Sequence, residues 1–457
     1  MNKPSLYQAL RQEAAKHIIR FHMPGHGGKT PPFPLEPIYP IDYTEIYNTG
    51  NLYEGTPPIS YGEQAAADYF GCPSVFFMTG GSTQGLCAAL MAGIPAGGSL
   101  LLDRNCHRSV LHGLALLNQT PHYLLPEILE PFGISGAIAP EQVQAGFRQH
   151  PEATALLITS PTYYGVRLDI AGLAEACHRL GKTLIVDQAH GAHFPAVGLP
   201  SAVQEGADLA IVSAHKTLPC LGQSGFLLSN DRISAETIRH ALSVFGTSSP
   251  SYLLMASMDQ AVGWLMEEGK NAYRQTAEQT AALRRQLQAE TDFLPLTEEI
   301  GYVLDPCRLT VCCAGLNLTG IALSQILYDR FGMACEMADD RNIVAIITAA
   351  HTPQELGALR DALTQLHPKK QTHLLLSIPQ ALPPQRLSLR EAFFAPVRFC
   401  KPEQAIGQIC ARPVVPYPPG VAVICPGEEI TLTQIEFLCK SCYNFSEEIA
   451  VVAAQGG

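Results

Sequence analysis

Short apolar runs alternate with amphipathic segments between about residues 70 and 230. Runs of four or five apolar residues bounded by Gly, Pro or polar residues are typical of buried strands. Strands that alternate with helical segments indicate βαβ units and a mainly parallel sheet. The expected strands are 74–78, 99–102, 155–159, 183–186, 209–212 and 226–228, and the expected helices are 82–92, 107–117 and a segment capped by Asp169 that ends at Gly181.

The order of expected strands and helices changes near residue 295. Strands are expected at 308–313 and 344–347 and helices at 322–331 and 353–366, the mixed order of an α+β domain. Residues 367–372 form a possible linker, 413–420 a Pro-rich turn, and a last helix starts near Leu432. We therefore expect an N-terminal arm over 1–70, a large domain over 71–294 and a smaller C-terminal part over 295–457.

Composition favours a globular protein with a small-molecule partner. Of 457 residues, 47% are hydrophobic and 16% charged, which excludes disordered, collagen-like and coiled-coil classes. Thirty Lys and Arg stand against 41 Asp and Glu, without the basic run that indicates nucleic-acid binding. The uncharged stretch 69–102 is interrupted by Gly and Pro, so we expect no membrane span. The charged residues within 1–20 argue against a secretory signal, and we expect a cytosolic location.

The sequence has 14 cysteines, which without a secretory signal indicates reduced thiols, most of them buried as small apolar side chains. The single CxxC, Cys439 to Cys442, has no second pair at zinc spacing. We therefore expect no metal site.

Two polar segments follow expected strands and carry residues suited to an aldehyde cofactor. Lys216, in Ser213-Ala-His-Lys, could form a Schiff base, because burial lowers the pKa of an amine and makes it nucleophilic. Asp187 could hold a pyridine nitrogen protonated, with His190 near the same ring. Taken singly, these residues could equally be a solvated lysine, a helix cap and a core histidine. Their joint placement at two strand ends favours a cofactor site.

Two loops, each between an expected strand and an expected helix, add a candidate phosphate site and a histidine that could stack on a cofactor ring. Residues 79–85 place Gly81, Ser82 and Thr83 at a helix N-terminus, where backbone N–H groups bind phosphate. The loop matches neither the Walker pattern nor GxGxxG, so nucleotide binding is not favoured. Residues 103–109 place His107 where its imidazole could stack on a cofactor ring. The alternatives are an ordinary Ser cap in the first loop and an Asp103 or Asn105 cap in the second.

Together these motifs resemble the bacterial Orn/Lys/Arg decarboxylases, enzymes dependent on pyridoxal 5'-phosphate (PLP), and in particular the shorter members without an N-terminal wing domain. The matching motifs begin at Met23, Asp42, Thr79, Asp103, Ser160, Asp187, Ser213, Ser248 and Tyr417. The resemblance implies an α/β fold, the PLP-dependent transferase fold type I. It also implies a mainly parallel seven-stranded sheet in the large domain and a smaller C-terminal α+β domain.

The resemblance implies roles for single residues. Lys216 would carry the cofactor, Asp187 would face its ring nitrogen, His107 would stack on the ring and His215 would assist catalysis. The residues implied around PLP are Gly81, Ser82, Thr83, His107, Thr162, Asp187, His190, Ser213, His215 and Lys216. Residues 248–252 would approach the cofactor of a second subunit, since such sites form at the interface of a homodimer.

The implied reaction is decarboxylation of arginine, lysine or ornithine to CO2 and an amine, in polyamine synthesis or acid consumption. Lys216 or His215 would return a proton to the substrate. Candidates to read the substrate's distal cation are Asp42, Glu45, Glu54 and Glu428. Two alternatives remain: an aminotransferase or β-eliminating lyase, in which Arg308 or Arg398 could bind the α-carboxylate, and a binding protein that has kept the fold.

Overall fold

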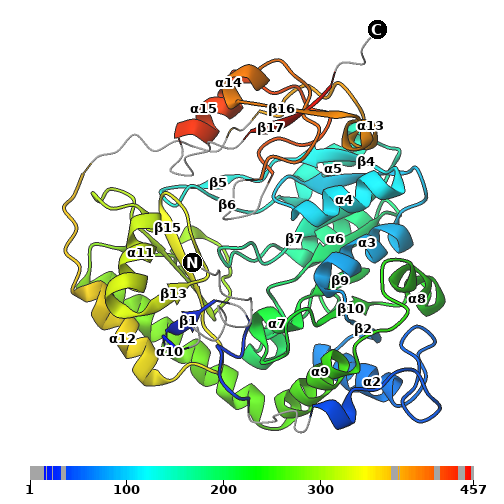
Figure 1. The fold of residues 1–457 in the computed structure, drawn as a ribbon, viewed down its shortest axis with the longest axis horizontal. Coiled ribbons are helices and arrows are strands. Elements are labelled where there is room, and N and C mark those ends of the chain that lie inside the picture. Colours follow the sequence, from blue (N-terminus) through cyan, green and yellow to red (C-terminus); the bar gives the residue numbers. More distant parts are fainter. Residues whose placement is uncertain are drawn as a thin grey trace, which may run out of the picture.

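The computed structural model describes residues 15–16, 18–22, 24–31, 38–371, 379, 381–415, 422–440 and 448–453 (Figure 1). The predictions made for Met23, for the motif at 417–420 and for Cys442 lie outside the described residues, as does part of the Pro-rich turn. Among the described residues, no helix has both the length and the apolar character needed to cross a membrane.

The central sheet consists of β2 Ser74–Met78, β3 Ser99–Asp103, β4 Thr120–Leu124, β7 Ala153–Thr159, β8 Thr183–Asp187, β9 Leu209–Val212 and β10 Gly225–Ser229. The seven strands lie in the order β2-β10-β9-β8-β7-β3-β4. β10 is antiparallel to both neighbours and the other pairs are parallel, which confirms the mainly parallel sheet. The edge strand β4 was not predicted, because Pro121 and its half-exposed side chains break the apolar pattern.

Helices cover both faces of this sheet, so its strands are apolar on both sides. One face packs against α3 Gly81–Gly93, α4 Arg108–Leu117 and α8 Ala235–Val244, and the other against α2 Ile59–Phe70, α5 Pro140–Gln149, α6 Ile170–His178 and α9 Tyr252–Trp264. β2 illustrates the alternation: Val75 and Phe77 belong to the core of one face, Phe76 and Met78 to that of the other. Asp169 caps α6 as predicted, by accepting a hydrogen bond from the Gly172 amide.

A second, antiparallel sheet contains β11 Leu294–Pro295, β12 Arg308–Cys312, β14 Met337–Ala338 and β15 Asn342–Ile346. Its core includes residues of α10 Lys270–Glu290, α11 Gly320–Phe331 and α12 Pro353–Thr364. In the N-terminal segment, β1 Ile19–Phe21 pairs in parallel with β13 Met333–Cys335. Residues 19–21, within the N-terminal arm or segment expected over 1–70, therefore join this small-sheet unit.

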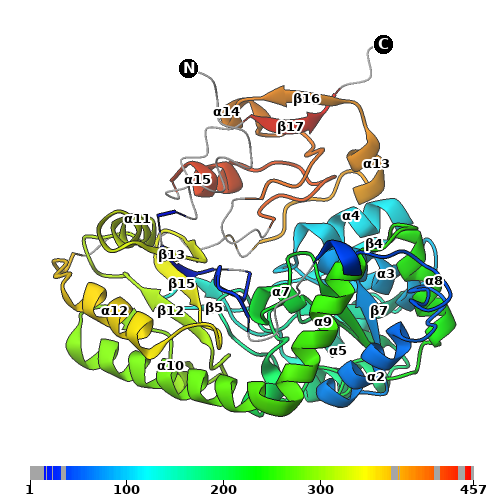
Figure 2. The ribbon, with the colours of Figure 1, turned by 60° about the horizontal axis from the view of Figure 1, so that its bottom comes forward.

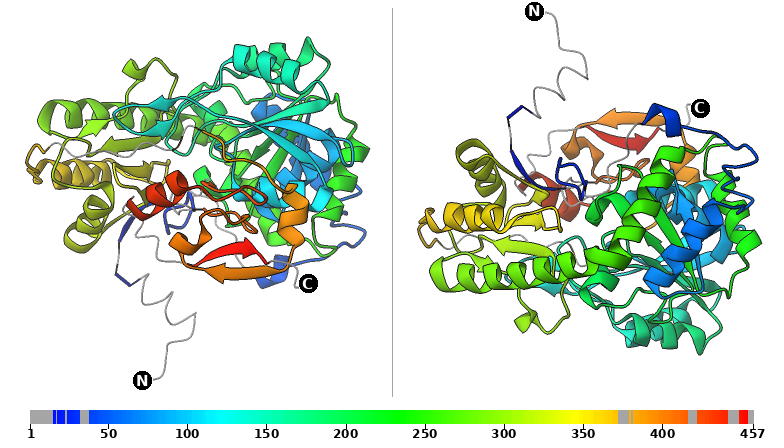
Figure 3. Two further views of the ribbon diagram at one scale, coloured as in Figure 1. Left: turned by 90° about the horizontal axis from the view of Figure 1, so that it is seen from above. Right: turned by 90° about the horizontal axis from the view of Figure 1, so that it is seen from below.

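The C-terminal unit has its own core around Cys400, Ile424 and Leu438. It contains α13 Leu389–Phe394, β16 Val397–Cys400, α14 Pro402–Ala405, α15 Leu432–Lys440 and β17 Ile449–Val452, with β16 and β17 antiparallel. Figure 2 shows this unit, orange to red, above the other two, and in both views of Figure 3 it overlaps them in projection. Its helix α13 packs against α4 of the large-sheet unit. The exact domain bounds stay a prediction.

A buried ion pair ties the C-terminal unit to the large sheet. Arg104, directly after β3, donates to both carboxylate oxygens of Glu428 at 2.7 and 2.9 Å. The Glu428 side chain is 1% exposed and also accepts from the Cys425 amide at 2.7 Å. Arg104 further donates to the Val423 carbonyl at 3.2 Å. A charge this deeply buried must keep its partner, so the pair fixes the two units to each other.

Replacing Glu428 with alanine leaves the Arg104 guanidinium buried without its partner. We expect Glu428→Ala to lower the free energy of unfolding by about 3–5 kcal/mol. The neighbouring Glu429 pairs with Arg386 at the surface, so Glu429→Ala should lower it by less than about 1 kcal/mol. Urea unfolding of both variants beside the unmodified protein measures the difference, and equal effects would contradict the assignment.

Candidate active site

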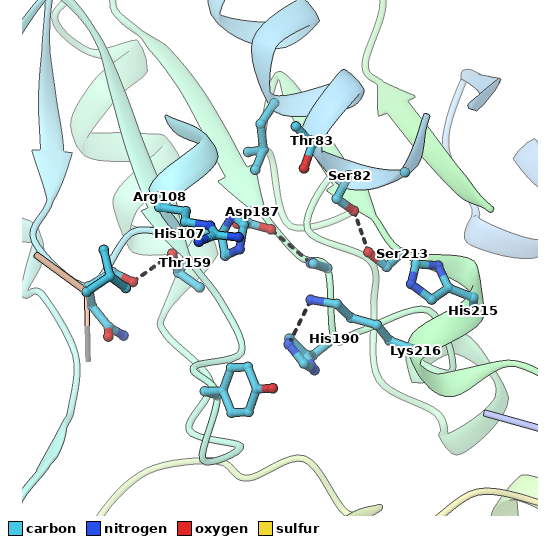
Figure 4. Close-up of a pocket in the computed structure, with 16 residues that line it drawn as sticks. Ser82, Thr83, His107, Arg108, Thr159, Asp187, His190, Ser213, His215 and Lys216 are labelled. Carbon is cyan, nitrogen blue, oxygen red and sulfur yellow. Dashed lines mark hydrogen bonds between the residues drawn. The ribbon is translucent and has the colours of Figure 1, made fainter. Parts of the chain in front are cut away.

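Parallel strands bring four polar positions to one edge of the large sheet. Asp103, Thr159 and Asp187 end β3, β7 and β8, and Ser213 follows β9. Because the carboxyl ends of parallel strands meet at the same edge, ligands of such sheets bind there. A cavity of about 570 Å³ lies at this edge (Figure 4), a volume ordinary for a small-molecule site. Its lining consists of Gly81, Ser82, Thr83, Leu86, Asn105, His107, Arg108, Thr159, Tyr163, Asp187, Ala189, His190, Ser213, His215, Lys216 and Val415.

The structure brings together every residue implied around the cofactor except Thr162. Thr162 is buried in a tight turn, where its amide donates to the Val166 carbonyl and its hydroxyl accepts from the Val166 amide. Its neighbour Tyr163 lines the cavity instead. The loop therefore reaches the cavity through Tyr163 and not through Thr162, because the direction of a side chain in a turn depends on hydrogen bonds within that turn.

Lys216 lies in the short helix α7 Ala214–Thr217 and points into the cavity (Figure 4). Its Nζ is 3.1 Å from Nε2 of His190. Burial lowers the pKa of the Lys216 amine, against the opposing effect of the nearby Asp187. The alternative of a solvated surface lysine is therefore wrong.

A buried guanidinium fixes the tautomer of His190. Arg308, at the start of β12, places Nη2 3.0 Å from Nδ1 of His190. A guanidinium only donates hydrogen bonds, so Nδ1 accepts and the proton of a neutral imidazole sits on Nε2. Burial, Lys216 and Arg308 together hold the pKa of His190 well below its usual value, which keeps the ring neutral. Nε2–H then donates to Lys216, and only an unprotonated amine can accept that bond.

Asp187 presents a buried carboxylate to the same cavity. Its Oδ1 accepts from the Ala189 amide at 3.1 Å, a local turn bond and not a helix cap. Burial raises the pKa of Asp187, against the effect of Lys216. A carboxylate kept from water in this way favours a cationic ligand, such as a protonated ring nitrogen.

The N-terminus of α3 forms an anion site beside Lys216. Gly81 has φ +66°, and the N-cap residue Gly80 has no side chain to bond the first amides of the helix. Those amides are therefore available to a phosphate. The hydroxyls of Ser82 and Ser213 lie 2.5 Å apart beside them, and His215 donates from Nδ1 to the Ser224 carbonyl at 2.9 Å. The alternative of an ordinary Ser cap is wrong for this loop.

His107 lies at the N-cap of α4, where its Nδ1 accepts from the Ser109 amide at 3.3 Å. The alternatives that Asp103 or Asn105 caps this helix are therefore wrong. Burial and the nearby Lys216 lower the pKa of His107 to about 4. The imidazole is thus neutral and flat at the cavity wall, which suits stacking on an aromatic ring.

The acidic residues suggested to bind the substrate's distal cation lie outside the cavity lining. Asp42 and Glu54 are exposed, Glu45 is half-buried, and both oxygens of Glu428 bind Arg104. Among the described residues that line the cavity, Asp187 is the one acid. Sequence reasoning missed Glu336, which accepts from the Tyr163 hydroxyl at 2.5 Å and acts on the pKa of both Lys216 and His215. No local motif marks it, because it follows β13 in a different unit.

Three further side chains lie outside the cavity lining: His193, three residues after His190, and the two arginines that the aminotransferase alternative would use. His193 is a core histidine, fully buried with Nε2 2.8 Å from Oδ1 of Asp305. Arg398 is exposed on β16, and Arg308 lies behind His190 outside the cavity lining. Neither arginine offers its guanidinium to the cavity as the aminotransferase alternative requires.

These residues fit PLP group by group. The uncapped start of α3 matches the phosphate, Asp187 the ring nitrogen, His107 the ring face and Lys216 the aldehyde. The four features face one cavity, so one molecule can contact them all.

Comparisons with known proteins agree with this geometry. The family model "Orn/Lys/Arg decarboxylase, major domain" matches residues 4–300, and the corresponding C-terminal domain model matches residues 376–448. An arginine decarboxylase of Bacillus subtilis is 32% identical over 95% of this chain and 93% of its own length. A lysine decarboxylase of Hafnia alvei is 22% identical over 96% of this chain and 75% of its own length.

Solved structures share the fold. The constitutive lysine decarboxylase of E. coli matches with a TM-score of 0.72 and 21% identity, over 85% of this chain and 69% of that one. An alanine–glyoxylate aminotransferase from Nostoc sp. matches with a TM-score of 0.55 and 16% identity, over 67% of this chain and 85% of that one. The expected fold type I is thus confirmed. The chain belongs to the Orn/Lys/Arg decarboxylase family of PLP-dependent lyases.

Proposed function

We propose that this protein decarboxylates a basic amino acid, with arginine as the first candidate. The observation that carries the proposal is the meeting of Lys216, Asp187 and His107 in one cavity. Arginine is favoured because the arginine decarboxylases named among the relatives match along nearly their whole length. The lysine decarboxylases are longer and less similar.

When bound, PLP supplies an aldehyde and a ring that accepts the electron pair released as CO2 leaves. Lys216, held as a free amine by His190, is the group we propose to react with that aldehyde. Asp187 would hold the proton on the ring nitrogen, and His107 would pack against the ring face. The amides at the start of α3, with Ser82 and Ser213, would bind the phosphate.

We favour Lys216 over His215 as the group that returns a proton to the substrate, because its free amine could first take up the proton that the substrate's ammonium group loses. The His215 proton sits on Nδ1 and is directed at the Ser224 carbonyl, so a neutral ring has no proton on Nε2. Burial lowers the pKa of His215, which keeps the ring neutral. His215 then serves to accept a hydrogen bond at the cavity wall.

An exposed apolar segment supports a homodimer. Tyr39 and Tyr47 are 91% and 98% exposed, and Ile38, Tyr43 and Ile46 beside them are about half exposed. Exposed groups of this kind mark protein interfaces. Residues shortly after the segment contact the expected intersubunit residues or their neighbour: Tyr252 donates to the Gly50 carbonyl at 2.5 Å, and Tyr53 to that of Thr247 at 3.0 Å. We further infer, from the family alone, a cytosolic location and a product used in polyamine synthesis.

The activity is tested by CO2 release from arginine, lysine and ornithine in parallel, with PLP added. We expect release from arginine, and a fall in kcat of at least about a thousandfold in Lys216→Ala, since the reacting amine is removed. Lys270→Ala, at an exposed lysine, is the matched control and should retain full activity. Formation of a keto acid without CO2 would overturn the proposal and favour an aminotransferase.

The role of Arg308 is tested on the apoenzyme by the pH dependence of Lys216 modification with a lysine-specific reagent. In Arg308→Met, His190 loses the donor that fixes its tautomer and Lys216 loses a nearby cation. The midpoint of reactivity should move to higher pH, because both changes favour the protonated amine. Arg308→Lys, which keeps the charge, should move it less. An unchanged midpoint in Arg308→Met would show that His190 does not control the amine.

The dimer is tested by sedimentation velocity of a double variant. We expect the unmodified protein to sediment as a dimer and Tyr39→Ser with Tyr47→Ser to shift it toward the monomer, because burial of both rings is lost. Leu180→Ser, at an exposed apolar residue beyond α6, is the control and should remain dimeric. A dimer unaffected by the double variant would place the interface elsewhere.

A further inference from the structure

A tyrosine and a carboxylate connect the cofactor cavity with the small-sheet unit. Tyr163, in the loop after β7, lines the cavity, and its hydroxyl donates to Oε1 of Glu336 at 2.5 Å. Glu336 lies between β13 and β14, 173 residues further along the chain. The steps of the reaction proposed above give this pair no task. A substrate with a distal cation, however, needs an acceptor of hydrogen bonds in the cavity.

Tyr163 lies close to the amine that we propose to react. Its ring meets that of His190 edge to face, with ring centres 4.7 Å apart and an interplanar angle of 63°. His190 in turn lies 3.1 Å from Nζ of Lys216. Figure 4 shows His190 on the opposite side of that amine from Ser82 and Asp187, the groups that match the phosphate and the ring nitrogen. The guanidinium of arginine lies roughly 6 Å beyond Cα when the side chain is extended, so a substrate beside Lys216 can reach past His190 to Tyr163.

The hydrogen bond to Glu336 determines what Tyr163 offers to a ligand. A phenolic hydroxyl carries a single proton, and here that proton is directed at Oε1 of Glu336. The oxygen of Tyr163 therefore meets a ligand as an acceptor, and the carboxylate behind it makes that oxygen more negative. Guanidinium and ammonium groups only donate hydrogen bonds, so they complement this oxygen.

Glu336 also brings negative charge to this side of the cavity. Among the described residues of the lining, Asp187 is the one acid, and it matches the ring nitrogen of the cofactor. Burial lowers the pKa of Lys216 and of His215, and Glu336 opposes that shift in both, so its charge acts on groups inside the cavity. Opposite charges attract more strongly where the surroundings are less polar than water. A cation beside Tyr163 is therefore stabilised by Glu336 without touching it.

The pair is held in place before a ligand binds. The amide of Glu336 donates to the Val344 carbonyl at 2.9 Å, which attaches its segment to β15. The next residue of the loop, Tyr164, donates to Oδ2 of Asp339 at 2.6 Å. Two successive tyrosines thus join the loop to one segment of the small-sheet unit. An acceptor fixed in this way loses little conformational entropy when it binds a ligand.

The two tyrosine–carboxylate pairs differ in their surroundings. Tyr164 and Asp339 are both buried, and neither lines the cavity. Tyr163 is only partly buried, and it faces the cavity. The buried pair is enough to explain how the loop is attached. The position of the second pair at the cavity wall is therefore better explained by contact with a ligand.

We propose that Tyr163, oriented and polarised by Glu336, accepts a hydrogen bond from the distal cation of the substrate and so selects basic amino acids over neutral ones. In this assignment Tyr163 contacts the substrate, and Glu336 acts through it as a positioning residue. The assignment rests on the proposed function for the reaction, and on the cavity for the preference for a cation. It makes the small-sheet unit a determinant of specificity.

The test compares the binding of two amines to the holoenzyme by calorimetry. Agmatine carries a distal guanidinium, and n-pentylamine ends in a methyl group. Both present the same amine to the cofactor, so a change at the Lys216 end affects both alike and the ratio of their dissociation constants reports the distal end. We expect the unmodified protein to prefer agmatine. The preference should fall roughly ten- to a hundredfold in Tyr163→Phe, which loses the acceptor, and about tenfold in Glu336→Gln, which loses the charge.

Tyr164→Phe is the matched control, because it removes the same hydroxyl from the buried pair. It should lower the Tm and leave the ratio unchanged. Glu336→Asp keeps the negative charge and should retain more of the preference for agmatine than Glu336→Gln does. A purely structural role of the pair would instead change the Tm in Tyr163→Phe and leave the ratio as it is.

Equal affinity of the unmodified protein for both amines would overturn the assignment. A preference for agmatine that survives in both Tyr163→Phe and Glu336→Gln would also overturn it, and would place the acceptor elsewhere. Release of CO2 from arginine, measured on the same samples, separates the assignment from the proposed function. Release with an unchanged ratio in the variants contradicts the assignment alone. No release, with a ratio that depends on Glu336, contradicts the proposed function and supports the assignment.

Discussion

The site depends on holding an amine and a carboxylate out of water in the same cavity. Burial opposes the charged form of each, so it lowers the pKa of Lys216 and raises that of Asp187. Their hydrogen bonds go to different partners, His190 for the amine and the Ala189 amide for the carboxylate. An aldehyde carbon and a cationic ring nitrogen are the ligand groups that match such a pair. The fold thus favours the cofactor before any substrate contact is considered.

The state of the amine depends on a contact between two units of the chain. His190 follows β8 of the large sheet, and Arg308 begins β12 of the small one. The bond between them, at 3.0 Å, fixes which nitrogen of His190 carries the proton. Tyr163 and Glu336 form a second bond between the same units, at 2.5 Å. The packing of the small sheet on the large one therefore adds to the effect of burial on the pKa of Lys216, which Arg308 lowers and Glu336 raises, although no residue of the small sheet lines the cavity.

Sequence reasoning was accurate where function follows from position along a strand. Apolar runs located the strands, and the geometry of parallel strands then placed Asp187 and Ser213 at one edge. It was inaccurate where a side chain's partner is distant: Arg308 lies 118 residues from His190, and Glu428 lies 324 residues from Arg104. Pairing at such separations leaves no local pattern. Tyr163 lines the cavity in place of Thr162 for another reason. Hydrogen bonds inside a turn decide which of two neighbouring side chains faces the cavity.

The loop after β3 connects the stability of the C-terminal unit with the geometry of the site. Arg104 binds Glu428 of that unit, and His107, three residues further on, forms a wall of the cavity. Between them, Asn105 donates its amide to Oδ1 of Asp103 at 2.8 Å, which holds the loop in a tight turn. Val415, from the C-terminal unit, also lines the cavity. A buried ion pair that could be regarded as purely structural therefore also restrains the His107 imidazole at the cavity wall.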